Sequence, residues 1–223
     1  MKTKKTNRYG NGLKKFGLCA FTAALISVNV CQPYIYPVYA DDVQEESSAQ
    51  AEIETMYIST VDDFLEFAAN CYIDSWSVNK KIVLRNNLDF TGRELVMVPV
   101  FAGEFDGNGH TISGIDFTGE SYVTAIFRYV EENGVIDSLN VKGNIAALDE
   151  QECVGGIVGS NYGTIKNCSF EGTVNGKNTI GGIAAFNKST GVIKKCEVRG
   201  RITGSYYTGG ITGINHGIIN NCA

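Results

Sequence analysis

Histidine is scarce in this sequence, which limits the chemistry available to it. The 223 residues include two histidines, His110 and His216, and neither stands in a His-Glu-x-x-His arrangement. Zinc catalysis needs several ligands that converge on one ion. We therefore expect no metal site, no cofactor and no zinc-protease centre in this chain. His110 follows a glycine turn and His216 lies in a variable loop, so both are interpreted as exposed structural residues.

Basic residues are also few once the first 40 positions are set aside. Those positions hold six of the 19 Lys and Arg residues and none of the 24 acidic residues. The remainder has 13 basic and 24 acidic residues, so its net charge is −11 instead of −5. DNA and anionic lipid surfaces bind proteins through clustered Lys and Arg. The composition excludes nucleic acid as a partner.

The sequence has no apolar run long enough to favour a membrane span. The run Leu18–Val30 follows a basic segment and precedes the small-residue ending Val38-Tyr39-Ala40. This order is typical of a secretory signal peptide, so residues 1–40 are expected to be removed after Ala40. The mature protein is then secreted or held at the cell surface. Residues 41–56 are rich in acids and poor in large apolar side chains, which predicts a disordered acidic linker.

A unit of about 27 residues repeats over the last hundred positions. Copies begin at Val154, Ile180 and Thr208, and each carries Gly-Gly-Ile near its start, an Asn-containing turn and a cysteine at its end. Repeats of this length are typical of stacked, quasi-one-dimensional folds. Two extra residues lie between Asn187 and Gly191, which predicts a loop there. A degenerate earlier copy, from about residue 121, has Leu139 at the cysteine position and Ala125 near the glycine position.

One amphipathic helix precedes the β-rich part. Thr60 can cap the first amides of a helix over residues 61–70, while Asp62 and Asp63 favour the positive end of its dipole. Residues 57–80 are expected to form this capping helix and the loop into the first coil. Strand-like alternation starts near Lys81, so residues 81–223 are assigned to the β-region.

The β-region is predicted to be a right-handed parallel β-helix, so the fold class is all-β with a short N-terminal capping α-helix. The unit is long enough for three strands, its apolar positions are mainly β-branched, and no Leu-x-x-Leu-x-Leu spine of a leucine-rich repeat is present. Glycines at 172 and 200 predict corners, and a bend is required at Lys166-Asn167. Equivalent positions should stack inside as columns: Ile157, Ile183 and Ile211; Ile165, Ile193 and Ile219; Cys168, Cys196 and Cys222; Phe170 and Val198.

The mature chain has five cysteines, an odd number, in an oxidising compartment. The stacked cysteines lie at neighbouring coils, but parallel side chains have poor geometry for a disulfide. Buried thiols that act as small hydrophobes are the favoured interpretation, because Leu139 occupies the same position in the early copy. Cys71 and Cys153 could pair only if the cap meets that coil.

These features resemble the GLUG-motif repeats of bacterial exported proteins. The matching features are the Gly-Gly-Ile-x-Gly core, the Asn-x-Gly turn and the Ile-x-Asn-Cys ending, and the segment 105–114 resembles the one that commonly precedes such repeats. The resemblance covers roughly residue 57 to the C-terminus. It implies a surface or secreted module of an anaerobe-type or Gram-positive bacterium. Such repeats also occur in the non-catalytic N-terminal regions of zinc-dependent immunoglobulin A proteases, which implies a second role to test.

A polysaccharide hydrolase or lyase is the enzymatic alternative. Asp89, Asp106 and Asp116 are its candidate carboxylates, because glycoside hydrolysis needs two carboxyl groups across the scissile bond. A turn better explains Asp106, and strand alternation points Asp89 and Asp116 outward. Asp106 and Asn108 also begin like a calcium loop, but its twelfth position is Phe117 instead of Glu. We therefore expect no catalytic residues.

Binding is the remaining class of function. Tyr162, Tyr206 and Tyr207 fall in loops between coils, where exposed aromatics can contact a glycan or protein ligand or simply cover a flank of the solenoid. We predict a non-enzymatic adhesion, interaction or spacer module with a host or cell-envelope protein or glycan as partner. The chain stops at Ala223, partway through a repeat, so the last coil is expected to be incomplete and to need further repeats or a capping partner.

Overall fold

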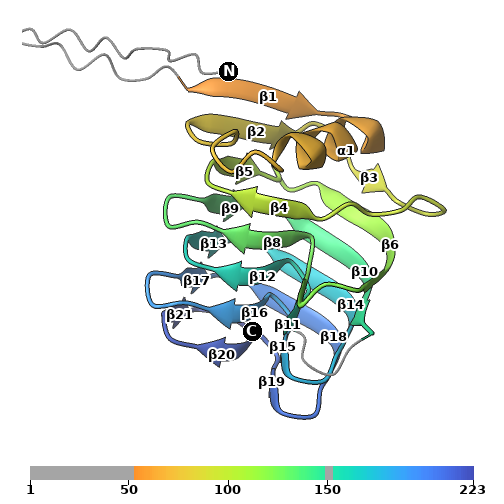
Figure 1. Ribbon diagram of the computed structural model, residues 1–223, viewed down its shortest axis with the longest axis vertical. Coiled ribbons are helices and arrows are strands. Elements are labelled where there is room, and N and C mark those ends of the chain that lie inside the picture. The colour runs from red at the N-terminus through yellow and green to blue at the C-terminus, as the bar shows by residue number, and fades with distance from the viewer. Residues whose placement is uncertain (1–52, 149–152) are drawn as a thin grey trace, which may run out of the picture. The chain divides into compact units, whose positions relative to one another are not determined.

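The computed structural model describes residues 53–148 and 153–223, which form a parallel β-solenoid of about six turns (Figure 1). Four sheets run along it, and the strand pairings within them are parallel. The expected leader and residues 41–52 of the expected linker lie outside the described residues. No helix in the described part of the chain is long and apolar enough to cross a membrane.

Successive coils contribute strands to the four sheets in turn, with sheet D beginning at β7. Sheet A contains β1 (Glu54–Ile58), β2 (Lys80–Leu84), β5 (Glu104–Asp106), β9 (Val135–Asp137), β13 (Thr164–Lys166), β17 (Val192–Lys194) and β21 (Ile218–Asn220). Sheet B contains β3 (Leu88–Asp89), β6 (Thr111–Gly119), β10 (Asn140–Ala147), β14 (Ser169–Asn175) and β18 (Glu197–Thr203). Sheet D contains β7 (Val123–Thr124), β11 (Cys153–Gly155), β15 (Thr179–Gly181) and β19 (Tyr207–Gly209). Sheet C contains β4 (Val98–Phe101), β8 (Phe127–Val130), β12 (Val158–Asn161), β16 (Ala184–Asn187) and β20 (Thr212–Asn215).

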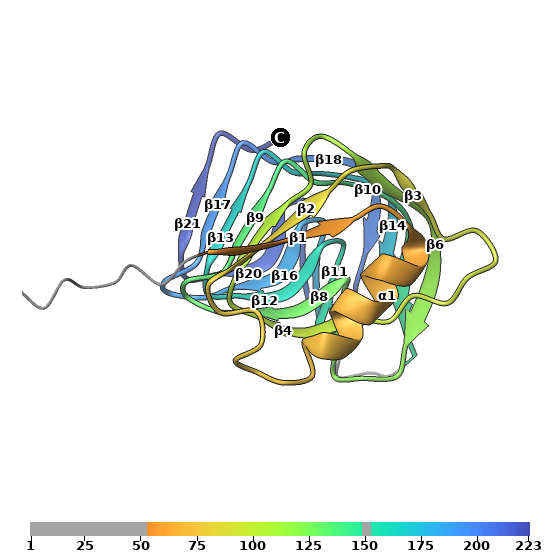
Figure 2. The same cartoon turned by 90° about the horizontal axis from the view of Figure 1, so that it is seen from above.

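The predicted capping helix is present as α1 (Val61–Asn70), and Figure 2 shows it lying across the first coils. Its N-terminus has a capping box, because the Asp63 amide donates to the Thr60 hydroxyl at 3.2 Å and the Thr60 amide donates to the Asp63 carboxylate at 2.9 Å. Hydrogen bonds from the Ser59 and Thr60 amides lower the pKa of Asp63. The buried Phe67 ring lies 5.6 Å from the Phe105 ring, so α1 closes the apolar interior at this end.

The solenoid begins earlier than the sequence predicted. Residues 54–56, expected in the acidic linker, belong to β1, which pairs with β2 in the register Met56 to Ile82. Met56 therefore starts an interior column that was expected to begin after residue 80. Pairing with β2 satisfies the backbone N–H and C=O groups of β1, and this pairing does not depend on which side chains β1 carries. Helix α1 follows β1 in the chain and so lies between the first two strands of sheet A in sequence.

The predicted interior columns are confirmed. Ile165 pairs with Ile193 and Ile193 with Ile219, while Phe170 pairs with Val198. Ile157, Ile183, Cys168 and Cys196 are buried, and the members in the last described coil are partly buried or exposed. Asn140 pairs with Ser169, which places Leu139 in the register of Cys168. The exchange of leucine and cysteine therefore marks an apolar position, as inferred.

The predicted bends are also present. Asn167 has φ of 54°, and the equivalent Ser138 and Lys195 both have 53°, so the chain turns with a left-handed residue before each leucine or cysteine. Gly143, Gly172 and Gly200 form a stacked column in sheet B with φ of 155°, 146° and 154°. A Cβ atom on the middle glycine would lie 1.9 Å from the carbonyl oxygen of the preceding one. This corner therefore accepts only glycine.

The Gly-Gly pair of each repeat forms the sharp corner between sheets D and C. A Cβ atom at Gly155 would lie 1.9 Å from the carbonyl oxygen of Val158, and one at Gly156 would lie 2.1 Å from that of Gly182. The degenerate copy avoids this constraint by being one residue shorter here. Val154 pairs with Thr124 and Val158 with Phe127, so two residues replace three. This deletion explains why Ala125 departs from the glycine pattern.

The corner between sheets C and A contains a ladder of asparagines, of which Asn161 and Asn187 are buried and Asn215, in the last described coil, is exposed. Asn161 donates to the side-chain oxygen of Asn187 at 2.8 Å, and Asn187 donates to that of Asn215 at 2.8 Å. Each of them also donates to a turn carbonyl, for example Asn187 to Gly191 at 3.2 Å. The insertion predicted between Asn187 and Gly191 lies in this turn, outside β16 and β17. The two extra residues are tolerated because the hydrogen bonds of the Asn187 side chain fix the corner, and these bonds do not depend on the length of the loop.

Cys71, Cys153, Cys168 and Cys196 are buried, which agrees with the interpretation of buried thiols, and no disulfide joins the described cysteines. Cys71 packs in the main core at the end of α1, whereas Cys153 lies in a separate small cluster, so the cap does not bring these two together. The Cys168 thiol donates to the Lys166 carbonyl at 3.1 Å. Burial raises the pKa of Cys168 well above its ordinary value.

The Cys71 thiol is expected to resist alkylation in the native protein. Burial raises its pKa to about 12, while the ordinary value is 9.0, so the thiolate is absent at pH 8. Iodoacetamide at pH 8 should leave this peptide unmodified until denaturant is added, as read by mass spectrometry. The stability that this neutral thiol contributes is fully present below pH 9 and is lost as the pH rises towards 12. Rapid native labelling of Cys71 would contradict its burial.

Candidate interaction surface

The structure does not bring the three predicted tyrosines together. Tyr206 and Tyr207 are 70% and 57% exposed where β18 leads into β19, at the corner of sheets B and D. Tyr162 is half-buried in the turn between β12 and β13, at the corner of sheets C and A. Tyr206 and Tyr207 therefore stand apart from Tyr162, and only Tyr162 borders the cluster described next.

Two half-buried aromatic rings, those of Tyr129 and Phe186, lie on the outer side of sheet C. Tyr129, Ser160 and Phe186 pair in register on β8, β12 and β16, so the two rings are two strand spacings apart, about 9.6 Å. Both rings are half-buried and pack against a small apolar cluster of Val123, Cys153 and Ala185, which is separate from the main core. The small apolar cluster at the corner of sheets D and C thus packs against both rings.

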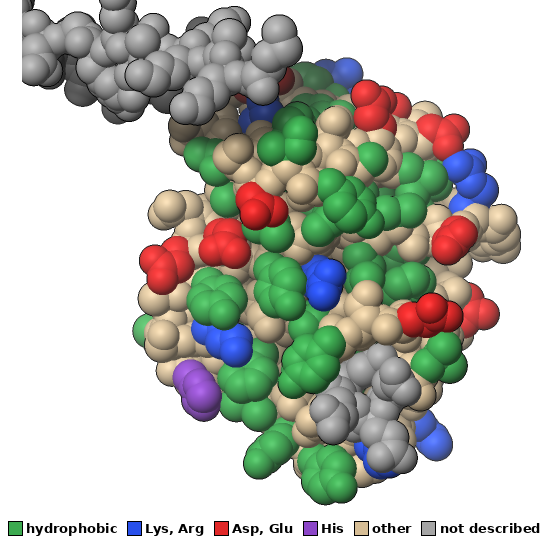
Figure 3. Space-filling view, viewed as in Figure 1, with side chains coloured by type: hydrophobic (Ala, Val, Ile, Leu, Met, Phe, Trp, Pro, Cys, Tyr) green, Lys and Arg blue, Asp and Glu red, His purple; other side chains and the backbone are tan. Residues whose placement is uncertain are grey.

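Cations accompany the aromatic rings on this surface. The Lys188 ammonium lies 3.6 Å from the centroid of Phe186 and 5.8 Å from that of Tyr162. The Arg128 guanidinium lies 5.3 Å from the centroid of Tyr129. Neither cation forms an ion pair with a described residue. Figure 3, which looks onto sheet C, shows apolar side chains gathered over its strands with Lys and Arg side chains between them.

Sheet C contains no acidic residue at all. Its five strands read VPVF, FRYV, VGSN, AAFN and TGIN. This absence contrasts with the net charge of −11 that remains after the expected removal of the leader. The turn beside the sheet does contain acids, because Glu131 and Glu132 follow β8 directly and Glu131 takes the stacked position that Tyr162 and Lys188 have in later coils. We call Arg128, Tyr129, Ser160, Phe186 and Lys188 the sheet C cluster.

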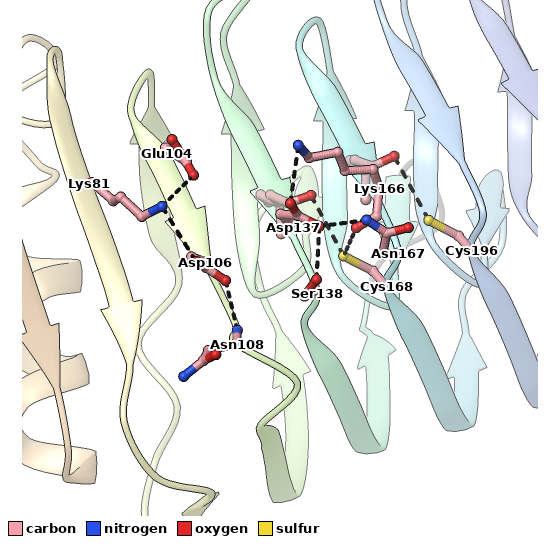
Figure 4. A network of polar contacts seen from close by, with 12 residues as sticks. Lys81, Glu104, Asp106, Asn108, Asp137, Ser138, Lys166, Asn167, Cys168 and Cys196 are labelled. Carbon is pink, nitrogen blue, oxygen red and sulfur yellow. Dashed lines mark hydrogen bonds and ion pairs between the residues drawn. The ribbon is translucent and has the colours of Figure 1, made fainter.

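Sheet A carries the opposite arrangement, in which each acid has a cation beside it (Figure 4). Lys81 lies 2.9 Å from Glu104 and 3.5 Å from Asp106. Asp137 lies 3.1 Å from Lys166 and accepts a hydrogen bond from Asn167 at 2.8 Å. The opposite charges compensate one another along sheet A, so we assign these side chains a role in holding the coils together.

The pKa shifts on sheet A follow from these contacts. Burial opposes ionisation of Asp137, but hydrogen bonds from Asn167, Lys166 and Ser138 outweigh it and lower the pKa of this carboxyl group. The hydrogen bond to Glu104 raises the pKa of Lys81. Both groups are therefore held in their charged forms, so neither is suited to donate or remove a proton near neutral pH.

The carboxylates considered for glycan hydrolysis do not form a pair. Asp106 lies in sheet A, whereas Asp89 and Asp116 lie in sheet B and are exposed. The Asp106 carboxylate accepts from the Asn108 amide at 2.9 Å, which confirms its role in the turn. Hydrogen bonds from the Thr91 hydroxyl and amide lower the pKa of Asp89. This arrangement does not match an acid and a base across a scissile bond.

Neither histidine belongs to a group of metal ligands among the described residues. His216 is exposed, as predicted, and its ring packs edge-on against Phe186 with centroids 5.5 Å apart. His110 is half-buried, not exposed, and its Nδ1 lies 3.3 Å from the side-chain oxygen of Asn87. Within residues 53–148 and 153–223, no three His, Cys, Asp or Glu side chains could hold one ion.

The sequence analysis missed Tyr129, Phe186 and Lys188. The repeat does contain a signal for the two aromatic residues, since the residue before each ladder position is Ser160, Phe186 or Ile214 in successive copies, with Tyr129 in the degenerate one. This position changes between copies and carries a large side chain outside the core in each of them except at Ser160. Variable, large residues at a fixed outward position indicate a surface that can contact another molecule.

Comparisons with known proteins agree with the repeat. A family model described as the GLUG motif matches residues 150–175. Halomucin of Haloquadratum walsbyi is 38% identical over 85 residues, which cover 37% of this chain and 1% of halomucin. A "Putative Gly-rich membrane protein" of Evansella cellulosilytica is 35% identical over 74 residues, which cover 32% of this chain and 8% of that protein. The chain thus matches only a small share of the length of these relatives.

A solved structure shares the architecture. The crystal structure of "a putative immunoglobulin A1 protease" of Bacteroides ovatus superimposes with a TM-score of 0.60 at 20% identity. The matched region covers 75% of this chain and 56% of that chain. At this identity the similarity shows the fold alone. Together with the stacked Gly-Gly corners, the asparagine ladder and the leucine or cysteine column, these matches show that the chain carries the GLUG motif on a parallel β-solenoid.

Proposed function

We propose that this protein is an exported, non-enzymatic β-solenoid that serves at the cell surface as an adhesion, interaction or spacer module. The observation that carries the proposal is the sheet C cluster, where half-buried aromatic rings lie beside Arg128 and Lys188, neither of which forms an ion pair with a described residue. A binding surface needs such preorganised groups, whereas catalysis would need a titratable pair. The relatives named halomucin and Gly-rich membrane protein support a location at the cell surface.

The second candidate role is the non-catalytic N-terminal region of a larger surface zinc metalloprotease. The specific observation in its favour is the shared fold with the Bacteroides ovatus protein described as an immunoglobulin A1 protease. In this role the solenoid would present or space a catalytic domain encoded elsewhere in the same protein. A metal-binding helix downstream in the coding sequence would favour this role, and a cell-wall sorting signal would favour the first one.

Export is expected to release a chain that begins at Asp41. The reason is the basic segment, the apolar run and the Val-Tyr-Ala ending of the first 40 residues. Expression of the full chain in a bacterial host, followed by cell fractionation and N-terminal sequencing, checks this expectation. A variant with Ala40→Leu is the matched control, because a large residue at this position should block cleavage. Recovery of an intact N-terminus in the cytoplasm would refute the proposed export.

The non-enzymatic part of the proposal has its own assay. Purified residues 41–223 should release no new reducing ends from a panel of neutral and acidic polysaccharides over a day. If reducing ends did appear, and if they were lost in both the Asp106→Asn and the Asp89→Asn variant, the protein would be the glycan-active enzyme considered above and not a non-enzymatic module.

A further inference from the structure

Charge is distributed unevenly along the axis of the solenoid. Residues 53–148, which form the first coils, contain 14 acidic and six basic residues, so their net charge is −8. Residues 153–223, which form the last coils, contain two acidic and seven basic residues, so their net charge is +5. On the face drawn in Figure 3, the acidic side chains of the described residues are confined to the upper and middle coils. The described solenoid therefore has an acidic end and a basic end.

Ion pairs within the chain do not cancel this asymmetry. Both acids of the last coils are already paired, because Glu171 lies 2.8 Å from Lys142 and Glu197 lies 2.7 Å from Arg199. Five of the 14 acids in the first coils form ion pairs, so nine of them form none with a described residue. The charges left over are mainly acidic in the first coils and basic in the last coils. Such charges remain available to another molecule.

One facet of sheet B carries this asymmetry on a regular row of side chains. The facet lies between the glycine column and sheet D, and its outer row runs Asp116, Asn144, Thr173 and Arg201 on β6, β10, β14 and β18. Asp116 and Arg201 are exposed and three strand spacings apart, about 14 Å, which is too far for an ion pair within one chain. The two middle residues are uncharged and joined by a 2.7 Å hydrogen bond. The neighbouring outer row is also uncharged and consists of Thr118, Ala146, Asn175 and Thr203.

The charged row is complementary to its own reverse. A second copy can be placed against the facet by a two-fold axis that runs along the strands, midway between β10 and β14. Asp116 of each copy then faces Arg201 of the other copy, and Asn144 faces Thr173. This operation also sets the acidic coils of one copy beside the basic coils of the other, so the wider fields attract. With parallel solenoid axes, like charges would lie at the same level and repel.

We propose that two copies of this protein associate side by side, with antiparallel solenoid axes, through this facet of sheet B. Two ion pairs between Asp116 and Arg201 of opposite copies hold the contact, and the uncharged rows pack between them. The facet is small compared with the surface that a stable dimer buries, so the Kd at about 20 mM salt should be on the order of 0.1 mM. The proposal goes beyond the surface role proposed above and does not depend on export.

The test is sedimentation equilibrium of purified residues 41–223 at low salt. Asp116→Arg should raise the dimer Kd about tenfold or more, because both symmetric contacts then bring two arginines together. Arg201→Asp should have the same effect, and the double variant should return the Kd to within about threefold of the original. Glu132→Arg is the matched control, since it changes the net charge equally at an exposed turn after β8 and should alter the Kd less than about threefold. Thermal melting of each variant checks that folding is retained.

Disulfide trapping determines the orientation of the two copies. The variants are made in a Cys222→Ser background, which removes the one described thiol that is not buried. Asp116→Cys combined with Arg201→Cys should give a covalent dimer under mild oxidation. Neither single variant should do so, because equivalent positions of antiparallel copies lie about 14 Å apart.

Four results would overturn the proposal. They are a monomer at every concentration, a covalent dimer from either single cysteine variant, no recovery in the double charge variant, and equal weakening by Glu132→Arg. Dimerisation that is lost when residues 41–52 are removed, and unaffected by the changes at Asp116 and Arg201, would assign the contact to the acidic segment and would also overturn it. None of these results affects the export and product assays, so the proposed surface role is judged separately.

Discussion

Gly156→Ala is expected to destabilise the protein by about 4 kcal/mol or more, enough to prevent folding at 37 °C. An added Cβ atom would lie 2.1 Å from the carbonyl oxygen of Gly182 and 2.7 Å from the Phe170 ring. Backbone atoms of the next coil cannot move away without breaking the register of sheets C and D. Because the site is in the middle of the stack, fraying of the last coil cannot relieve the clash.

The repeat supplies its own control for this change. Gly210 occupies the same motif position as Gly156, but a Cβ atom there would meet nothing within 4 Å. Gly210→Ala should therefore change the free energy of unfolding by no more than about 0.5 kcal/mol. Urea denaturation followed by circular dichroism compares the two variants. If both substitutions were tolerated equally, the Gly-Gly pair would not form the crowded corner described above.

Asn187→Leu is expected to lower the free energy of unfolding by about 3 kcal/mol. The substitution keeps the volume but removes the oxygen that accepts from Asn161 and the amide that donates to Asn215 and to the Gly191 carbonyl. The buried groups left without partners then bear the cost of desolvation. Guanidinium denaturation with tyrosine fluorescence measures the change.

Asn144→Leu is the matched substitution on the outer side of the solenoid. Its side chain is exposed and accepts one hydrogen bond from Thr173 at 2.7 Å. Water can replace this bond, so the expected loss is below about 0.5 kcal/mol. A loss at residue 187 no larger than that at residue 144 would show that the asparagine ladder does not hold the corner.

The interior of the fold could be predicted because the chain repeats its own constraints. Glycine at residues 172 and 200 marks a position with positive φ. Cysteine at residue 168 exchanges with leucine in the early copy, which marks a buried apolar position. Each repeated residue type therefore indicates one structural requirement. The helix was predictable from Thr60 and Asp63, which form its capping box. Packing inside a stack repeats from coil to coil, and the sequence repeats with it.

The parts that escaped prediction depend on contacts that do not repeat. Strand β1 lies next to an acidic stretch, and only its pairing with β2 makes it a strand. The deletion near Ala125 is visible only once Val154 is found opposite Thr124. Tyr129 and Phe186 lie in different copies, and their alignment across two strand spacings requires the register of sheet C. Tyr206 and Tyr207 are predicted from their positions in loops between coils, and such positions do not by themselves gather residues into a site.

Anomalous scattering from sulfur in a crystal of the mature chain would test the central claim most directly. The claim is that successive coils place equivalent side chains one above another in the interior. The account predicts three sulfur peaks, from Cys168, Cys196 and Cys222, in one row with neighbours about 4.8 Å apart along the solenoid axis. Sulfur peaks that are scattered, or that lie on the solvent side of the strands, would contradict the stacked architecture and the surface built on it.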